Sequence, residues 1–223
     1  TEQAGTRGLP VPEVLAELLP HGLPRGGIAV VQGATSVLLA LAQAAIGRER
    51  WCVLVGMPDV GWAAAAAGGL GLDRVVSVPH PGAQSAAVLG ALVDGFDVLV
   101  AGPGAQVAPA DRRNLTARVR QRGAVLLTDQ DWAGAHLQVQ VRPCMWRGVT
   151  AGHGVLSGRQ MDIRALGRGQ PVRQVRVLAG ADGLQPASAP VPATVAGTAD
   201  VVVGVGASEP ASGDALRHHR VGG

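Results

Sequence analysis

The chain of 223 residues contains no lysine and no tyrosine, and aromatic side chains make up only 2% of it. All 19 of its Lys-or-Arg positions are therefore arginines. The absence of lysine excludes Schiff-base chemistry, a lysine general base and the lysine of a phosphate-binding loop. A formal net charge of only +3 also gives no strongly basic character to the chain as a whole.

Cysteine is almost as scarce, because only Cys52 and Cys144 are present. Two cysteines so far apart predict neither a disulfide framework nor a metal site, and we expect two reduced core thiols in a cytoplasmic protein. No apolar run reaches the roughly 20 residues that a bilayer-spanning helix requires. The amino-terminal residues lack the charged-then-apolar pattern of a secretion signal. We therefore expect a soluble intracellular protein without membrane contact and without a bound metal or cofactor.

The chain is rich in aliphatic residues, since 47% of it is apolar. Apolar runs bounded by glycine or charged residues predict five buried strands, at residues 26–33, 51–56, 74–80, 97–102 and 124–129. Helical patterns follow the first four strands, at residues 35–47, 62–71, 83–93 and 111–122. This alternation predicts an α/β fold in which a mostly parallel sheet is flanked by helices on both faces.

The pattern changes after Asp131, where apolar and polar residues alternate with a period of two. This period predicts an antiparallel carboxy-terminal extension with one exposed face, over residues 137–142, 161–165 and 175–177. A short amphipathic helix is expected from Val11 to Pro20. From Gly183 onward no periodic apolar face remains, so we predict one core domain over residues 1–182 and a disordered tail over residues 183–223.

The junction after the first strand is where an open parallel sheet would bind a ligand, because glycine-rich turns there lead into helix amino termini. A phosphate-binding loop requires the pattern GxxxxGK[ST], in which backbone amides surround the phosphates and lysine neutralises their charge. The chain has only four residues at this place: Gly33, Ala34, Thr35 and Ser36. We therefore interpret the junction as a degenerate phosphate loop.

The segment GLPRGGI at residues 22–28, the strand order that follows and the closing segment RQMDIRALGRG at residues 159–169 resemble the core of the bacterial recombinase RecA. The resemblance covers about residues 15–180. It implies that Ala34 stands where the family has its phosphate-loop lysine. It also implies that Pro58 replaces the carboxylate that primes water and that Gly102 replaces the aspartate that orders magnesium. With all three groups missing, the resemblance implies a pseudo-ATPase without catalytic activity.

The two DNA-binding loops of the family would fall in residues 102–114 and 128–138, which are short and have no basic cluster. Seven arginines lie instead in the antiparallel extension, against a single aspartate, Asp162: Arg142, Arg147, Arg159, Arg164, Arg168, Arg173 and Arg176. Such a face can contact nucleic-acid phosphates or can consist of solvated side chains. The sequence leaves both interpretations open.

A degenerate, arginine-rich and lysine-free RecA core is similar to the ImuA-prime subunit of the actinobacterial mutasome, a part of the SOS response to DNA damage. This resemblance implies an accessory protein of error-prone translesion synthesis. Its implied partner is ImuB, a catalytically inactive homologue of Y-family polymerases. RecA itself is a further candidate partner, and an error-prone DNA polymerase would be an indirect one.

In the RecA family, a strand from one subunit adds to the sheet edge of the next subunit. The third predicted strand would be the accepting edge here, and such an edge exposes unpaired backbone groups. No donor strand is recognisable before the first predicted helix, so we expect a partner segment to occupy the edge. The predicted partner-binding residues are Arg74, Val75, Val76, Ser77, Val78, Ala87 and Leu89.

Two other functions fit the same residues. A cell-division inhibitor similar to SulA would have the same degenerate core and would bind a filament-forming protein instead of ImuB. An active recombinase-type ATPase with an aberrant loop would hydrolyse ATP, and it would lose this activity on substitution of Thr35. The identity of the partner separates the first two, and an ATPase assay separates the third.

Overall fold

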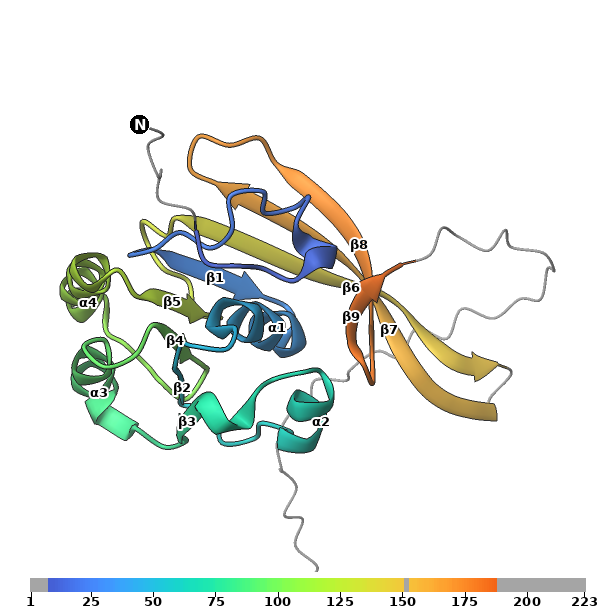
Figure 1. Ribbon diagram of the computed structural model, residues 1–223, viewed down its shortest axis with the longest axis horizontal. Coiled ribbons are helices and arrows are strands. Elements are labelled where there is room, and N and C mark those ends of the chain that lie inside the picture. Colours follow the sequence, from blue (N-terminus) through green and yellow to red (C-terminus); the bar gives the residue numbers. More distant parts are fainter. Residues whose placement is uncertain (1–7, 151–152, 188–223) are drawn as a thin grey trace, which may run out of the picture. The chain divides into compact units, whose positions relative to one another are not determined.

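The computed structural model describes residues 8–150 and 153–187, which belong to one compact unit that ends at Ala187. A single nine-stranded sheet runs through this unit in the order β3-β2-β4-β5-β1-β6-β7-β8-β9 (Figure 1). The sheet is parallel from β3 to β6 and antiparallel from β6 to β9. The predicted parallel core with an antiparallel extension is therefore confirmed.

The first five strands all form within the predicted runs: β1 Ile28–Gln32, β2 Cys52–Val55, β3 Val75–Val78, β4 Val98–Ala101 and β5 Val125–Thr128. Every residue of β2, β4 and β5 is buried. Continuous apolar runs behave in this way because helices cover both faces of a parallel sheet. The strand β3 is different, because it lies at the edge of the sheet and its two central residues are exposed.

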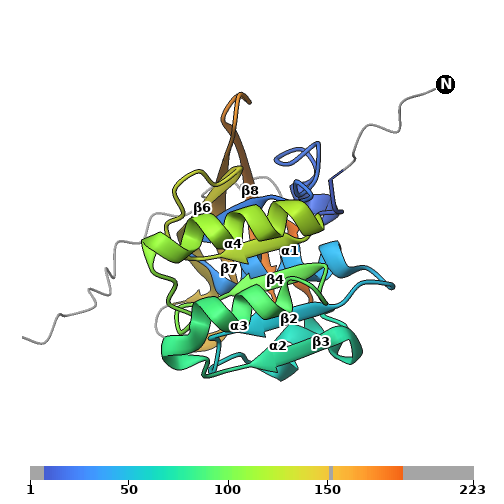
Figure 2. The ribbon, with the colours of Figure 1, turned by 90° about the vertical axis from the view of Figure 1, so that its left-hand side faces the viewer.

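Four helices cover the two faces: α1 Thr35–Ile46, α2 Trp62–Ala67, α3 Ser85–Leu92 and α4 Pro109–Arg122. The apolar side of α1 packs against one face together with the amino-terminal segment. On the opposite face, α3 and α4 lie side by side and form the second core (Figure 2). The single apolar stripe of α4, Leu115 and Val119, is buried in this second core, whereas all of its arginines except Arg112 are exposed.

The antiparallel strands are β6 Leu137–Thr150, β7 His153–Gly167, β8 Arg173–Gly180 and β9 Gly183–Pro186. The alternating apolar residues near the start of β6 face the first core, as their period of two predicts. Both β6 and β7 are far longer than the predicted segments, and the register between them shifts near Pro143 and again near Gly148. Register shifts of this kind interrupt the regular pairing of the two strands, as β-bulges do.

Three expectations need correction. The segment from Val11 to Pro20 forms only a short 3-10 helix, Glu13–Leu15, followed by turns. So short a segment is a marginal helix in water, and its leucines are buried in the first core without one. The tail does not begin at Gly183, since residues 183–186 pair with β8 as β9. The rest of the predicted disordered tail lies outside the described residues. Cys144 is exposed, so only Cys52 is a core thiol.

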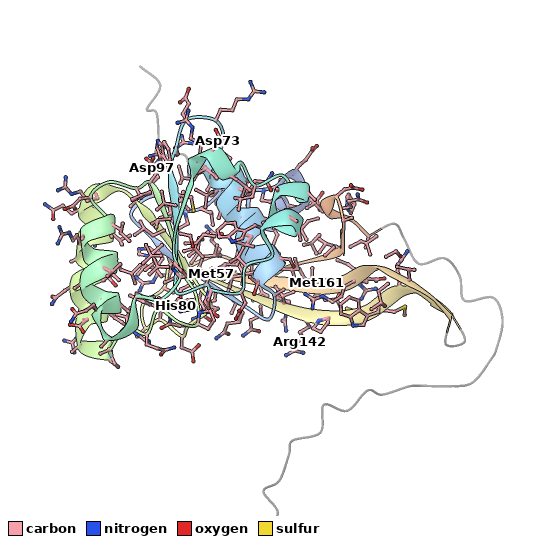
Figure 3. All side chains as sticks on the ribbon, turned by 90° about the horizontal axis from the view of Figure 1, so that it is seen from below. Met57, Asp73, His80, Asp97, Arg142 and Met161 are labelled. Atoms are coloured by element: carbon pink, nitrogen blue, oxygen red, sulfur yellow. The ribbon has the colours of Figure 1, made fainter. Side chains whose placement is uncertain are left out.

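The six parallel strands, β1 to β6, run in the same direction, so the loops before them and the loops after them lie at opposite ends of the sheet. Met57 and His80 follow β2 and β3, whereas Asp73 and Asp97 precede β3 and β4 at the other end (Figure 3). The carboxyl ends of the parallel strands therefore form one common edge, which is where open α/β sheets bind ligands. Among the described residues, no helix has the length and apolar character needed to cross a membrane.

Candidate functional site

The junction between β1 and α1 is the first part of the site, and it is very short. Only Gly33 and Ala34 separate the last residue of β1 from the first residue of α1. Gly33 has a φ of 97°, and a Cβ atom there would lie 2.1 Å from the carbonyl oxygen of Val141. The chain thus turns directly from strand to helix against β6. A two-residue turn cannot surround phosphates as the longer Gly-rich loop does.

The amino terminus of α1 carries no charged group. Ala34 is the N-cap residue, and its side chain makes no capping hydrogen bond. The side chains of Thr35 and Ser36 are exposed, so they are the two hydroxyl groups that remain at this end of the helix. The structure therefore brings all four residues of the predicted degenerate loop together, and it places them at the carboxyl edge of the sheet.

A cavity of about 420 Å³ opens beside this junction. Its walls come from the first turns of α1, the loop of residues 57–61, the helix α2 and the turn between β8 and β9. Pro58, one of the predicted lost acidic positions, lies in this wall next to Asp59. Among the described residues that line the cavity, Asp59 is the one charged side chain. An anionic ligand would therefore meet a carboxylate and no balancing cation.

The second predicted lost position, Gly102, follows β4 and has no room for a side chain. A Cβ atom at Gly102 would lie 2.2 Å from Cγ of Met57, and Met57 is itself buried in the first core. The Gly102 carbonyl accepts a hydrogen bond from Nε2 of Gln130 at 3.0 Å. An apolar side chain and an amide thus occupy the space in which a metal-ordering carboxylate would have to stand.

Asp129 and Gln130 directly follow β5 and therefore also lie at the carboxyl edge of the parallel strands. The sequence patterns did not single them out. Burial raises the pKa of the Asp129 carboxyl above its ordinary value. Within the described residues, Oδ1 of Asp129 and Oε1 of Gln130 are buried and have no hydrogen-bond partner. Their position directly after a buried strand is the signal that could have identified them.

The loops that the resemblance assigns to DNA binding pack against α4. In the second loop Trp132 is buried, and its Nε1 donates a hydrogen bond to the Thr116 hydroxyl at 3.0 Å. The Arg112 guanidinium lies 5.2 Å from the centre of the Trp132 ring. The Arg112 side chain also donates a hydrogen bond to the Val107 carbonyl at 2.9 Å, which connects the segment that precedes α4 to the first turn of that helix. These contacts fix the two loops to the body of the molecule.

The predicted partner-binding strand lies where it was expected, because β3 is the outer strand of the parallel part of the sheet. Cys52 to Val55 of β2 pair with Val75 to Val78 of β3, and within the sheet β3 pairs with β2 alone. Val76 faces the α3 side with Val78, since both pair with residues of β2 that belong to the second core. The side chain of Val76 is 37% exposed.

The rest of the predicted partner-binding set is only partly brought together. Ala87 on α3 is exposed, whereas Leu89 is completely buried beneath that helix. Leu89 therefore belongs to the second core, and the prediction that it lines a partner pocket is wrong. The reason is geometric, since Ala87 and Leu89 are two positions apart on a helix and face different sides.

Two exposed apolar side chains near β3 were not predicted as site residues. Leu72 lies in the 3-10 helix Leu72–Arg74 that directly precedes β3. The Arg74 guanidinium lies 5.4 Å from the centre of the exposed Trp51 ring, at the start of β2. Leu72, Trp51 and Val76 are therefore three exposed apolar residues in or beside the two outermost parallel strands. Tryptophan and arginine are the residue types that most often dominate binding surfaces.

A family model described as the MT3502 N-terminal domain matches residues 17–134, which is more than half of the chain. The chain belongs to this family. Over 169 residues it is 37% identical to an uncharacterized protein, Rv3395c, of Mycobacterium tuberculosis (strain ATCC 25618 / H37Rv). That match covers 70% of this chain and 83% of the relative.

Among solved structures, a crystal structure of the RadB recombinase is similar to this member of the MT3502 N-terminal domain family, with a TM-score of 0.58. The match covers 79% of this chain and 97% of the recombinase, at 13% sequence identity. At that identity the likeness establishes the fold alone. The RecA-like fold predicted from the strand order is thereby confirmed.

Proposed function

We propose that the protein is a non-catalytic, RecA-like accessory protein of the DNA-damage response. In this proposal it acts in error-prone translesion synthesis in the cytoplasm. Its β3 edge binds a segment of an ImuB-like homologue of Y-family polymerases, and through that partner it meets an error-prone DNA polymerase. Direct binding of RecA and weak contact with nucleic acid are further parts of the proposal.

The absence of catalysis is supported by the carboxyl edge of the sheet. The two-residue turn at Gly33 and Ala34 offers few amides for phosphates, and the cavity beside it contributes the carboxylate of Asp59 without a cation. A nucleotide triphosphate requires several positive groups for binding and for transition-state stabilisation. Met57 also fills the place next to Gly102 where a metal-ordering carboxylate would stand.

The β3 edge is the observation that carries the partner assignment. The Val78 carbonyl accepts a hydrogen bond from the Gly56 amide at 2.9 Å, so the backbone groups of Val78 point toward β2. Because the backbone groups of successive residues in a strand point to opposite edges, those of Val75 and Ser77 point outward. An extended partner segment can form backbone hydrogen bonds with these outward-facing amides and carbonyls.

The proposal is tested by replacing the outward-facing amide of Ser77. Ser77→Pro removes one donor on the open side of β3 while the hydrogen bonds to β2 remain, and proline is tolerated on an edge strand in this orientation. We expect this variant to lose binding of a co-expressed ImuB-like partner by at least about tenfold. Size-exclusion chromatography and titration of the purified pair measure this loss.

Ser77→Ala is the matched control, because it removes the hydroxyl and keeps the amide. We expect this variant to bind the partner as the unchanged chain does. Circular dichroism of both variants checks that the fold persists. Equal binding by Ser77→Pro and Ser77→Ala, with both variants folded, would contradict an added strand at β3.

A further inference from the structure

The far half of the hairpin formed by β6 and β7 lies on the other side of the sheet from β3. The pairing of β1 with β6 ends at Gln140, and β8 pairs with β7 only as far as Gly158. Past Gln140 the outer edge of β6 faces no further strand of the sheet, and the residues of β7 that precede Gly158 pair with β6 alone. This end of the hairpin projects from the body (Figure 1). We call residues 142–148 and 154–160 the distal arm. An isolated two-stranded ribbon is only marginally stable in water. A partner that covers the end of this arm would therefore stabilise it.

The distal arm exposes large apolar side chains on both of its faces. Met145, Trp146, Val155 and Leu156 have exposed fractions of 62%, 58%, 82% and 55%. Neighbouring residues of a strand point to opposite faces, so each pair of adjacent apolar residues places one side chain on each face. The first part of β6 has instead one buried apolar face and one polar face. The arm therefore departs from the pattern of a solvated sheet surface.

The arm also carries positive charge without any acidic residue. Between residues 141 and 160 the sequence contains Arg142, Arg147 and Arg159 and neither aspartate nor glutamate. The next carboxylate along the chain, Asp162, lies opposite Arg142 in the register of β6 and β7. It is held by Arg176 on β8, whose Nε lies 2.6 Å from Oδ1. That carboxylate is thus neutralised by its own partner and does not offset the charge of the arm.

Three contacts hold arginine side chains of the arm in place on the surface. The Arg159 guanidinium lies 5.5 Å from the centre of the Trp146 ring, and its Nη2 lies 3.3 Å from Sδ of Met161. On the other face, Nη2 of Arg147 donates a hydrogen bond to Oε1 of Gln160 at 3.2 Å. Ordering of this kind lowers the entropy that side chains lose when a partner binds.

We propose that the distal arm is a second docking surface, and that its occupant is an acidic protein segment with apolar anchor residues. The combination of tryptophan, methionine and arginine without acidic residues is the composition of an interface core. A partner segment with carboxylates complements the three arginines, and its apolar residues cover Met145 and Leu156. The outer edge of β6 in the arm, which faces no further strand of the sheet, gives such a segment a place to lie alongside.

Two other occupants fit the arm less well. A second copy of the same arm would bring two positive surfaces without acidic groups against each other. Single-stranded nucleic acid binds through bases stacked on aromatic rings. Here Arg159 already covers one face of Trp146, and the other large apolar residues exposed on the arm, Met145, Val155 and Leu156, have no aromatic ring.

The proposal is tested with the full chain as bait for a phage-displayed library of short random peptides. The matched variant is Trp146→Thr combined with Leu156→Thr, since threonine favours strands and removes the anchors. We expect the unchanged chain to enrich peptides that are net acidic and contain apolar residues, and the variant to enrich none of them. A synthetic peptide from the selection, followed by fluorescence anisotropy, should bind the variant about tenfold or more weakly.

Further measurements separate this surface from the others. Arg147→Gln with Arg159→Gln should also weaken the peptide, and increasing salt should do the same. Ser77→Pro, which alters the β3 edge, should bind the peptide with the same affinity as the unchanged chain. The test of the arm is therefore independent of the proposed ImuB-like partner at β3.

Several outcomes would overturn the proposal. Enrichment of basic peptides, or of no peptide that depends on the arm, contradicts an acidic occupant. Displacement of the peptide by oligothymidine, with tighter binding of the oligonucleotide, assigns the arm to nucleic acid. Self-association of the unchanged chain that the threonine variant abolishes assigns the arm to a second copy.

Discussion

The carboxyl group of Asp129 lies at the end of β5, and among the described residues its Oδ1 has no hydrogen-bond partner. Burial raises its pKa above the value of the unfolded chain, and a hydrogen bond from its own backbone only partly opposes this shift. The folded state therefore binds the proton more tightly than the unfolded state does. Consequently, this group lowers the free energy of unfolding as the pH rises through the interval between the two pKa values.

We expect Asp129→Asn to stabilise the protein at neutral pH by up to about 1 kcal/mol, since it removes the ionisation and keeps the shape of the side chain. The gain should vanish below about pH 4, where the unfolded carboxyl is also protonated. Urea unfolding of the unchanged chain and of Asp129→Asn, each at neutral pH and below about pH 4, measures the difference in the free energy of unfolding. An equal gain at low pH would assign the effect to packing instead of charge.

The two cysteines differ in accessibility, which gives a second residue-scale prediction. Burial raises the pKa of the Cys52 thiol to about 12, whereas Cys144 is exposed on β6. The thiolate is the reactive form, so Cys52 should remain unmodified in the folded chain. We expect a thiol reagent to label one cysteine per native chain and both after denaturation. Labelling of Cys144→Ser before unfolding would show that the β2 core opens under native conditions.

At the carboxyl edge of the sheet, the sequence shows which residues stand at the positions that the RecA resemblance singles out, but not which side chains pack around them. Ala34, Pro58 and Gly102 are visible in the sequence as uncharged residues at positions where the resemblance implies charged ones. That Met57 fills the space beside Gly102, and that Gln130 bonds to its carbonyl, depends on side-chain packing between separate loops. Leu89 shows the same limit, because the face of a short apolar helix is not fixed when nearly all of its residues are apolar.

At the scale of elements, the turn between β1 and α1 depends on Gly33. An alanine there would combine a positive φ with a Cβ only 2.1 Å from the Val141 carbonyl oxygen. We expect Gly33→Ala to lower the free energy of unfolding by about 2–5 kcal/mol through backbone strain and overpacking. Chemical denaturation measures this loss.

Gly169→Ala is the control for this prediction, because Gly169 also has a positive φ, of 70°, but its Cβ would meet nothing within 4 Å. The free energy of unfolding of this variant should fall only by the cost of the backbone strain, about 1–2 kcal/mol. The difference between the two variants isolates the contact with β6. Equal losses in both would show that the β1–α1 turn can move away from Val141.

The elements that could be predicted are those whose environment is uniform along their length. The strands β2, β4 and β5 are buried on both faces, so a continuous apolar run was sufficient evidence for each of them. The distal half of the β6–β7 hairpin was missed for the opposite reason. Its residues follow neither an apolar run nor a period of two, since Pro143, Gly148 and Gly154 interrupt the pattern and the register between the two strands shifts.

At the scale of the whole molecule, the order of the strands determines which surfaces are available. Sequence patterns predicted parallel strands but not their neighbours, and the edge position of β3 came from the RecA resemblance alone. The structure places β3 at one end of the sheet and β9 at the other. The two proposed docking surfaces, the β3 edge and the distal arm, are therefore separate, and a variant of one serves as a control for the other.

The carboxy-terminal limit of the compact unit gives a prediction at this same scale. The strand β9 pairs with β8 from Gly183↔Gly180 to Pro186↔Val177, and Leu184 packs against the first core. A pattern-based boundary at residue 182 excludes this strand, since the segment GLQP has no periodicity. A chain that ends at Asp182 should therefore be less stable than one that ends at Ala187, by about 1–3 kcal/mol.

Urea unfolding of the two truncated chains measures this difference, and both lack the same residues beyond Ala187. Leu184→Ser in the full chain provides the second measurement, because it removes the apolar contact of β9 and keeps its backbone pairing. This variant should show part of the loss seen on truncation at Asp182. If both truncated chains unfold at the same urea concentration, β9 contributes nothing to the unit, and the boundary at residue 182 is correct after all.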